Sequence, residues 1–139
     1  MRPAKSSVAD SPPESVVLDA SAMVEALLGT AVGLAVRERI RGCELHAPAH
    51  LDAEVLSALG RLHRAGELAA AAVSAGLKEL ASAPLRRHLL AGLLNGAWKA
   101  RERLRLVDAL YVELAGSLSA TLVTTDSRLA RECQLAELI

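Results

Sequence analysis

Short apolar runs alternate with longer stretches of helical periodicity along most of the chain. The first run, Val16-Val17-Leu18, has no polar position within it, which is typical of a parallel strand buried on both faces. Further strands are expected over residues 43–47, 85–89, 120–124 and 137–139. Apolar residues at helical spacing predict helices over residues 21–28, 31–40, 50–64, 67–82, 90–101, 105–118 and 127–133. Strands that alternate with helices predict an α/β fold with a parallel sheet covered on both faces.

The ends of these elements carry local signals. Ser21 is expected to cap the first helix, and Gly66 to separate the helices over 50–64 and 67–82. Residues 1–15 contain several prolines and serines and lack the apolar core of a signal peptide. We therefore expect a disordered N-terminal tail over residues 1–15, followed by one domain over residues 16–139.

Composition narrows the class of protein. No apolar run approaches the roughly 20 residues that span a bilayer, and Cys43 and Cys133 lie far apart without CxxC partners. These features predict a cytoplasmic protein with free thiols. Trp98 and Tyr111 are the only aromatic residues, apart from histidines, and the 16 basic residues equal the 16 acidic ones. The composition therefore offers neither a row of aromatic rings on which bases could stack nor a net positive charge that would attract nucleic acid.

Two aspartates follow strands at their carboxyl ends. Asp19 ends the first strand, and Asp126 follows the strand over residues 120–124 in the same way. Because parallel strands direct these ends to one edge of the sheet, where open α/β sheets bind ligands, both carboxylates are expected to reach one cleft. An alternative for Asp126 is an ordinary helix N-cap, and for Asp19 a hydrogen-bonded strand end.

Two helices supply further acidic candidates. Asp108 shares an otherwise apolar helical face with Tyr111 and Val112, so its burial requires a cation or a donor. The alternative is a first-turn aspartate favoured by the helix dipole. Asp52 and Glu54 lie on opposite margins of the apolar stripe of their helix, and helical geometry alone does not choose between them.

Carboxylates that converge on one sheet edge repel one another unless a divalent cation neutralises them, and hard oxygen ligands suit Mg²⁺ or Mn²⁺. The chain has no Gly-rich phosphate loop, no zinc-type spacing and no arguable Ser/His/Asp triad. We expect its scattered histidines to be surface or hydrogen-bonded residues; these are His46, His50, His63 and His88. The pattern indicates metal-assisted cleavage of phosphodiesters without a covalent nucleophile.

Four segments of the chain resemble the acidic blocks of PIN domains, in order and in spacing. They are residues 17–22 (VLDASA), 53–59 (AEVLSAL), 107–115 (VDALYVELA) and 122–130 (LVTTDSRLA). The likeness is closest to the VapC-type toxins of bacterial toxin–antitoxin pairs and extends from Val16 onward. The tail before the first block is longer than is usual in such toxins.

This resemblance implies a three-layer α/β/α sandwich with a short central parallel sheet of four or five strands. It implies a Mg²⁺-dependent endoribonuclease in which Mn²⁺ can substitute, and it selects Glu54 over Asp52. Asp19 and Asp108 would be the main metal ligands, Glu54 would bind the metal directly or through water, and Asp126 would hold or orient a second ion; the four together form the catalytic set. Ser21 and Thr125 would hydrogen-bond these carboxylates.

The resemblance also implies partners: an RNA substrate such as tRNA or rRNA, a VapB-like antitoxin protein and a second copy of the chain in a homodimer. Candidate phosphate contacts, which are otherwise solvated surface residues, are Arg61, Arg86, Arg101, Arg103 and Arg105.

Two other functions remain open. A PIN-like module that only binds a partner protein would keep the fold, although such modules commonly lose at least one acidic residue. A phosphoacceptor or phosphatase domain also places an aspartate at a strand end. It would be expected to carry a second acid in a D-x-D pattern and a lysine near a later strand, whereas this chain has Asp19-Ala20-Ser21 and no lysine after Lys99.

Overall fold

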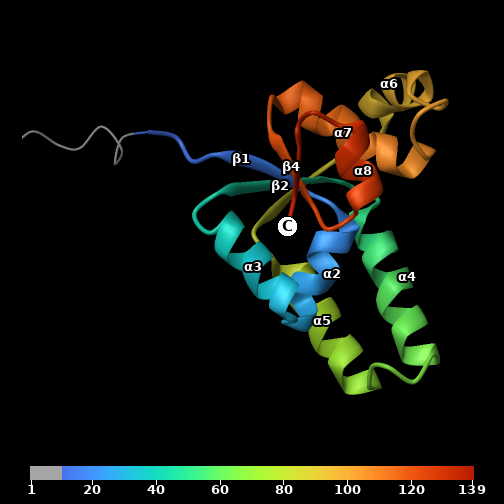
Figure 1. Cartoon of the computed structure of the whole chain (residues 1–139). Helices are drawn as coiled ribbons and strands as arrows, with labels where there is room; N and C mark the ends of the chain where they lie inside the picture. The colour runs from blue at the N-terminus through green and yellow to red at the C-terminus, as the bar shows by residue number, and fades with distance from the viewer. Residues whose placement is uncertain (1–10) are drawn as a thin grey trace, which may run out of the picture.

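Five parallel strands form the central sheet of the computed structural model, which describes residues 11–139 (Figure 1). The strands are β1 (Ser15–Leu18), β2 (Glu44–Pro48), β3 (Leu85–His88), β4 (Thr121–Thr124) and β5 (Ala136–Leu138). They are arranged in the order β3-β2-β1-β4-β5, and every neighbouring pair is parallel. The predicted parallel sheet is confirmed. The predicted tail lies mostly outside the described residues, which begin at Ser11.

Helices cover both faces of this sheet, as the sandwich prediction required. They are α2 (Ala20–Leu28), α3 (Ala31–Ile40), α4 (Leu51–Arg64), α5 (Ala70–Ser82), α6 (Leu94–Lys99), α7 (Leu106–Leu118) and α8 (Ser127–Glu132), with a 3-10 turn η1 (Ala91–Leu93) before α6. Figure 1 shows α7 and α6 on one face and α2 to α5 on the other, with α4 and α5 projecting as a helical pair. Among the described residues no single helix is long and apolar enough to span a membrane; α2 and α3 pass that test only together, across a 111° bend.

The core is aliphatic and centres on β1. Val16, Val17 and Leu18 are fully buried because β2 and β4 flank the strand and helices cover both of its faces. On α7, Tyr111 is only 1% exposed and is the largest fully buried side chain. This packing fixes the carboxyl end of β1, and with it Asp19, inside the protein.

Most of the observed bounds lie within one residue of those predicted, but three features differ more. Asp19 rather than Ser21 is the N-cap of α2, because its side chain accepts a hydrogen bond from the Ala22 backbone N–H. The helix predicted over 67–82 begins at Ala70, because the backbone N–H groups of Gly66 and Glu67 donate hydrogen bonds to carbonyl oxygens in the last turn of α4. The helix predicted over 90–101 divides into η1 and α6.

The corner between α2 and α3 brings two backbones into close contact at Gly33. A Cβ atom at this position would lie 1.8 Å from the carbonyl oxygen of Glu25. Thr30 caps α3 by accepting a hydrogen bond from the Gly33 N–H at 3.0 Å. Glycine is therefore needed here so that α3 can cross α2 closely.

The order of the strands creates a switch point at β1. The chain proceeds outward from β1 to β2 and β3, then crosses back to β4 on the other side of β1. In open α/β sheets a crevice forms outside the carboxyl ends of the strands at this point. Asp19 follows β1 and Asp126 comes two residues after the end of β4, so the topology places both beside the crevice.

Candidate active site

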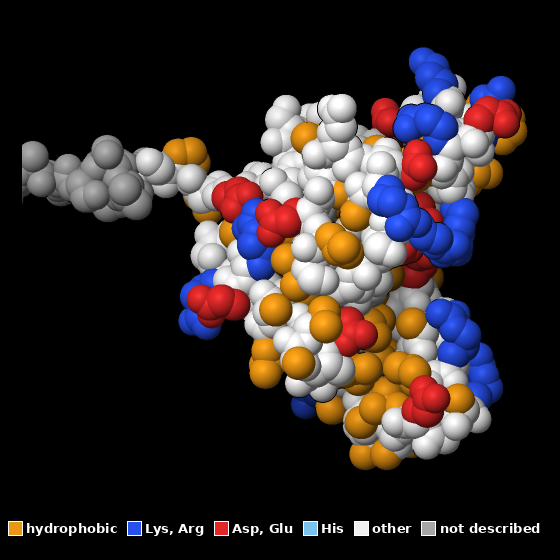
Figure 2. Space-filling view, in the orientation of Figure 1, with side chains coloured by type: hydrophobic (Ala, Val, Ile, Leu, Met, Phe, Trp, Pro, Cys, Tyr) orange, Lys and Arg blue, Asp and Glu red, His pale blue; other side chains and the backbone are white. Residues whose placement is uncertain are grey.

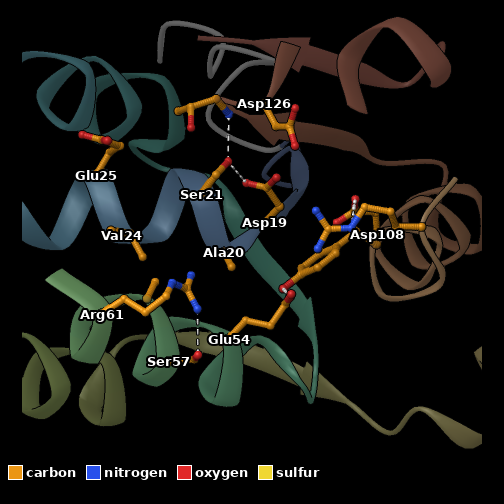
Figure 3. Close-up of a pocket in the computed structure, with 14 residues that line it drawn as sticks. Asp19, Ala20, Ser21, Val24, Glu25, Glu54, Ser57, Arg61, Asp108 and Asp126 are labelled. Carbon is orange, nitrogen blue, oxygen red and sulfur yellow. Dashed lines mark hydrogen bonds and ion pairs between the residues drawn. The ribbon is translucent and has the colours of Figure 1, made fainter. Parts of the chain in front are cut away.

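A cavity of about 410 Å³ lies at the switch point and is lined by all four carboxylates predicted for the site (Figure 3). Asp19 and Asp126 come from the ends of β1 and β4, Glu54 from the first turn of α4 and Asp108 from the first turn of α7. Asp52 does not line this cavity but lies on another side of α4. There it forms an ion pair with Arg87 of β3 at 2.7 Å.

Asp19 is buried and held by three donors. Its Oδ1 accepts from the Ser21 hydroxyl at 2.7 Å and from the Ala22 N–H at 2.9 Å, and its Oδ2 accepts from the Thr124 hydroxyl at 2.6 Å. Burial raises the pKa of Asp19, although these hydrogen bonds oppose the shift, and the charge of Asp126 raises it further. Asp19 is thus a rigidly oriented carboxylate whose charge is poorly solvated.

The loop after β4 is fastened to Asp19 through hydroxyl groups. The family resemblance implied that Thr125 hydrogen-bonds the carboxylates, but the hydroxyl that reaches Asp19 belongs to Thr124. Thr125 instead donates its backbone N–H to the Ser21 hydroxyl at 3.1 Å. Thr124 is the last residue of β4 and is fully buried beside the end of β1, whereas Thr125 lies beyond the strand.

Asp126 serves as an N-cap and lines the cavity at the same time. Its Oδ1 accepts from the Arg128 N–H at 2.9 Å, which caps α8, and its own N–H donates to the Thr124 hydroxyl at 3.0 Å. The two interpretations that the sequence left as alternatives are therefore compatible. The cap fixes Oδ1, and among residues 11–139 no hydrogen bond engages Oδ2 of Asp126.

Glu54 is positioned by a buried tyrosine that sequence reasoning did not assign to the site. The Tyr111 hydroxyl donates to Glu54 Oε1 at 2.6 Å, and burial raises the pKa of Tyr111, so that this proton is retained. His50 packs on the Tyr111 ring with centroids 4.8 Å apart, and its Nε2 lies 3.3 Å from the same oxygen of Glu54. The i, i+3 spacing of Asp108 and Tyr111 was the available sequence signal for this arrangement.

Asp108 has an intermediate exposure, with 22% of its side chain accessible. Burial raises its pKa, the nearby Arg105 opposes the shift, and the charges of Glu54 and Asp126 add to it. Arg105 Nε lies 3.8 Å from Asp108 Oδ2, an ion pair without hydrogen-bond contact. The carboxylates of the cavity therefore repel one another across it.

The five arginines predicted as phosphate contacts are dispersed. Arg61 and Arg105 line the cavity, and Arg61 donates to Ser57 of its own helix at 2.8 Å. Arg103 lies in an adjoining cleft, where Arg105 also contributes. Arg86 lies on β3, and Arg101 stacks over the Trp98 ring at 4.7 Å.

Sequence reasoning missed Glu25, which lines the cavity from α2.

The side chains predicted as ligands are of the kind that binds a hard divalent cation. The predicted set offers oxygen ligands alone, with no cysteine or histidine lining the cavity, and such a set favours Mg²⁺ or Mn²⁺. Between Ser11 and Ile139, no three His, Cys, Asp or Glu side chains are grouped so that they could hold an ion as they stand. Binding of a metal would therefore have to draw the carboxylates together.

Comparison with known proteins identifies the family. The PIN domain family matches residues 16–133. Ribonuclease VapC3 of Mycobacterium tuberculosis is 59% identical over 122 residues, which cover 87% of this chain and 89% of that protein.

Two solved structures share the fold. PAE2754 from Pyrobaculum aerophilum matches with a TM-score of 0.67 and 27% identity over 88% of this chain and 82% of that one. VapC20 of Mycobacterium tuberculosis, described as a toxin that cleaves the sarcin–ricin loop, matches with a TM-score of 0.59 and 21% identity over 84% of this chain and 93% of that one. The chain therefore belongs to the PIN-domain family and, within it, to the VapC ribonucleases.

Proposed function

We propose that this ribonuclease is a Mg²⁺-dependent endoribonuclease, with Mn²⁺ as a possible substitute, and that its catalytic residues are Asp19, Glu54, Asp108 and Asp126. The observation that carries the proposal is the convergence of these four side chains, from four separate elements, on one cavity. Four carboxylates in a shared cavity destabilise the folded state by mutual repulsion, which the long, exposed ion pairs of Arg105 and Arg128, at 3.8 Å and 3.9 Å, offset little. A divalent ion is the simplest compensation.

When bound, Mg²⁺ would supply a Lewis acid that activates water and neutralises charge that develops on the phosphodiester. Asp19 is suited to be its fixed ligand, because three donors hold its orientation. Tyr111 holds Glu54 in place by donating its hydroxyl to Oε1. Arg61 and Arg105 supply positive charge at the cavity wall, where a phosphate of the substrate would be attracted.

The biological setting that we propose follows from the family. The protein would act in the cytoplasm as the toxin of a toxin–antitoxin pair, as a homodimer, and would be neutralised by a VapB-like antitoxin. Structured RNA such as tRNA or rRNA is the expected substrate class. The structural likeness to VapC20, described as a sarcin–ricin loop cleaving toxin, makes rRNA a reasonable first candidate.

The test is incubation of purified, antitoxin-free protein with total RNA in Mg²⁺ or Mn²⁺, with EDTA as the paired condition. We expect defined cleavage products with metal and none with EDTA. Cleavage that persists in EDTA would refute the metal mechanism, and intact RNA in both conditions would refute the proposed activity.

A further inference from the structure

We propose that an arginine-lined cleft beside the active site binds the phosphate backbone of the RNA as it leaves the cavity. The cleft, of about 280 Å³, is lined by Arg103, Arg105, Arg128 and Arg131. Two of these, Arg128 and Arg131, were not assigned to any role by the sequence. The inference rests on the proposed function and adds to it the path that the substrate takes.

The cleft is continuous with the catalytic cavity. Arg105, Asp108 and Asp126 line both, and a third hollow of about 680 Å³ shares Arg103 and Arg131 with the cleft. Figure 2 shows Lys and Arg side chains gathered over α8 and the segment before α7, beside acidic side chains. The hollows form a track that starts at the proposed scissile position and is marked by arginines.

The guanidinium groups of this cleft are available to a ligand. Arg105 and Arg128 lie 3.8 Å and 3.9 Å from Asp108 and Asp126, too far for hydrogen bonds, and their side chains are 65% and 69% exposed. Among residues 11–139, no hydrogen bond or ion pair engages the side chain of Arg103 or Arg131. Planar guanidinium groups with free donors match the geometry of phosphate oxygens.

The charge balance of the cleft favours an anion even without metal, and a bound metal would strengthen that preference. Its four arginines face three carboxylates, from Asp108, Asp126 and Glu132. Two of these three belong to the proposed metal site, where a divalent cation would neutralise them. An RNA strand fits better than an acidic protein segment, because a strand held at the catalytic cavity must continue into an adjoining hollow.

The test uses the double variant Arg103→Ala/Arg131→Ala, which changes two exposed side chains that do not contact the four carboxylates of the site. Binding of a single-stranded RNA oligonucleotide is measured by fluorescence anisotropy in EDTA, where the proposed mechanism allows no cleavage, over a series of salt concentrations. A charge-matched control is Arg41→Ala/Lys78→Ala. Arg41 is at the end of α3 and Lys78 is on α5, and neither side chain lines the cavity or the cleft.

We expect the cleft variant to lose affinity about tenfold or more, because charge-assisted hydrogen bonds are removed. Each lost phosphate contact on a single strand should reduce the slope of log K against log salt by about 0.7, hence by about 1.4 in total. The control variant should keep the slope of the unmodified protein. In Mg²⁺ the cleft variant should also show a raised KM for RNA.

Unchanged affinity and slope in the cleft variant would overturn the proposal. The same holds if the variant keeps RNA affinity but loses affinity for a polyglutamate peptide, which would assign the cleft to an acidic protein segment. The two proposals can fail separately. If the unmodified protein does not cleave RNA with metal, but the slope of log K against log salt still falls by the expected amount in the cleft variant, the proposed function is wrong and the RNA-binding cleft stands.

Discussion

Exchange of Asp108 for asparagine should show whether Asp108 is a metal ligand or a structural carboxylate. In the metal-free protein the charge of Asp108 is disfavoured, because burial raises its pKa and Glu54 and Asp126 repel it. Asparagine has nearly the same shape without the charge. Asp108→Asn should therefore leave the metal-free protein at least as stable as the wild type near neutral pH.

Metal should stabilise the wild type and not this variant. An ion that binds only the folded state adds about 2.7 kcal/mol at a hundredfold excess over its dissociation constant. An unfolding entropy of about 2.1 cal/mol/K per residue over 139 residues amounts to roughly 290 cal/mol/K. Metal should therefore raise the melting temperature of the wild type by about 9 °C and that of Asp108→Asn by much less.

The assay is thermal unfolding in EDTA and in millimolar Mn²⁺. Asp52→Asn is the matched control, because Asp52 is on the same helix as Glu54 but pairs with Arg87 outside the cavity. It should keep the full metal effect and lose at most about 1 kcal/mol, as partly exposed ion pairs do. If the wild type gains nothing from Mn²⁺ and Asp108→Asn is clearly destabilised in EDTA, Asp108 is a structural residue and the reasoning is refuted.

The same proteins should differ in their dependence on pH. The raised pKa values of Asp19 and Asp108 mean that the folded state binds more protons than the unfolded state. The free energy of unfolding without metal should therefore fall as pH rises from about 4 through the folded-state pKa values, and then level off. Asp108→Asn should show a smaller fall over this range in a pH series of denaturant unfolding.

Two further predictions concern the positioning of the site and its scaffold. Tyr111→Phe removes the donor to Glu54 Oε1 and should weaken metal affinity or activity about 10–100-fold, as loss of such supporting hydrogen bonds does; Mn²⁺ titration and single-turnover cleavage measure this, and wild-type values for both would contradict it. Gly33→Ala would place Cβ 1.8 Å from a backbone oxygen and should cost about 3 kcal/mol or more by overpacking. Gly60→Ala, whose Cβ would find its nearest neighbour at 3.7 Å, should instead gain about 0.5–1 kcal/mol; equal effects of the two substitutions in urea unfolding would contradict the close helix contact.

The sequence predicts the sheet and the place of Asp19 because the signal is local. An unbroken apolar run such as Val16 to Leu18 is compatible with few structures other than a doubly covered strand, and the residue after it must lie at the sheet edge. The helices over 67–82 and 90–101 were placed less well. Their starts depend on how the preceding turn satisfies its own backbone groups, which apolar spacing does not report.

The finer features of the site depend on contacts between distant residues. Asp52 and Glu54 are equivalent on a helical wheel, and what distinguishes them is that α4 presents one to Arg87 of β3 and the other to Tyr111 of α7. The choice of Thr124 over Thr125 likewise depends on the register of β4 against β1. Arg128 and Arg131 resembled ordinary surface residues of a short helix until the fold placed them beside Asp126.

The most direct test of the central claim is single-turnover cleavage of RNA in Mg²⁺ by the matched variants Asp108→Asn and Asp52→Asn. A metal centre contributes several kcal/mol to stabilisation of the transition state, so loss of a ligand should slow cleavage about a thousandfold or more. We expect that loss for Asp108→Asn and a nearly wild-type rate for Asp52→Asn. Equal rates for the two variants, or a greater loss for Asp52→Asn, would contradict the assignment of the active site to this cavity.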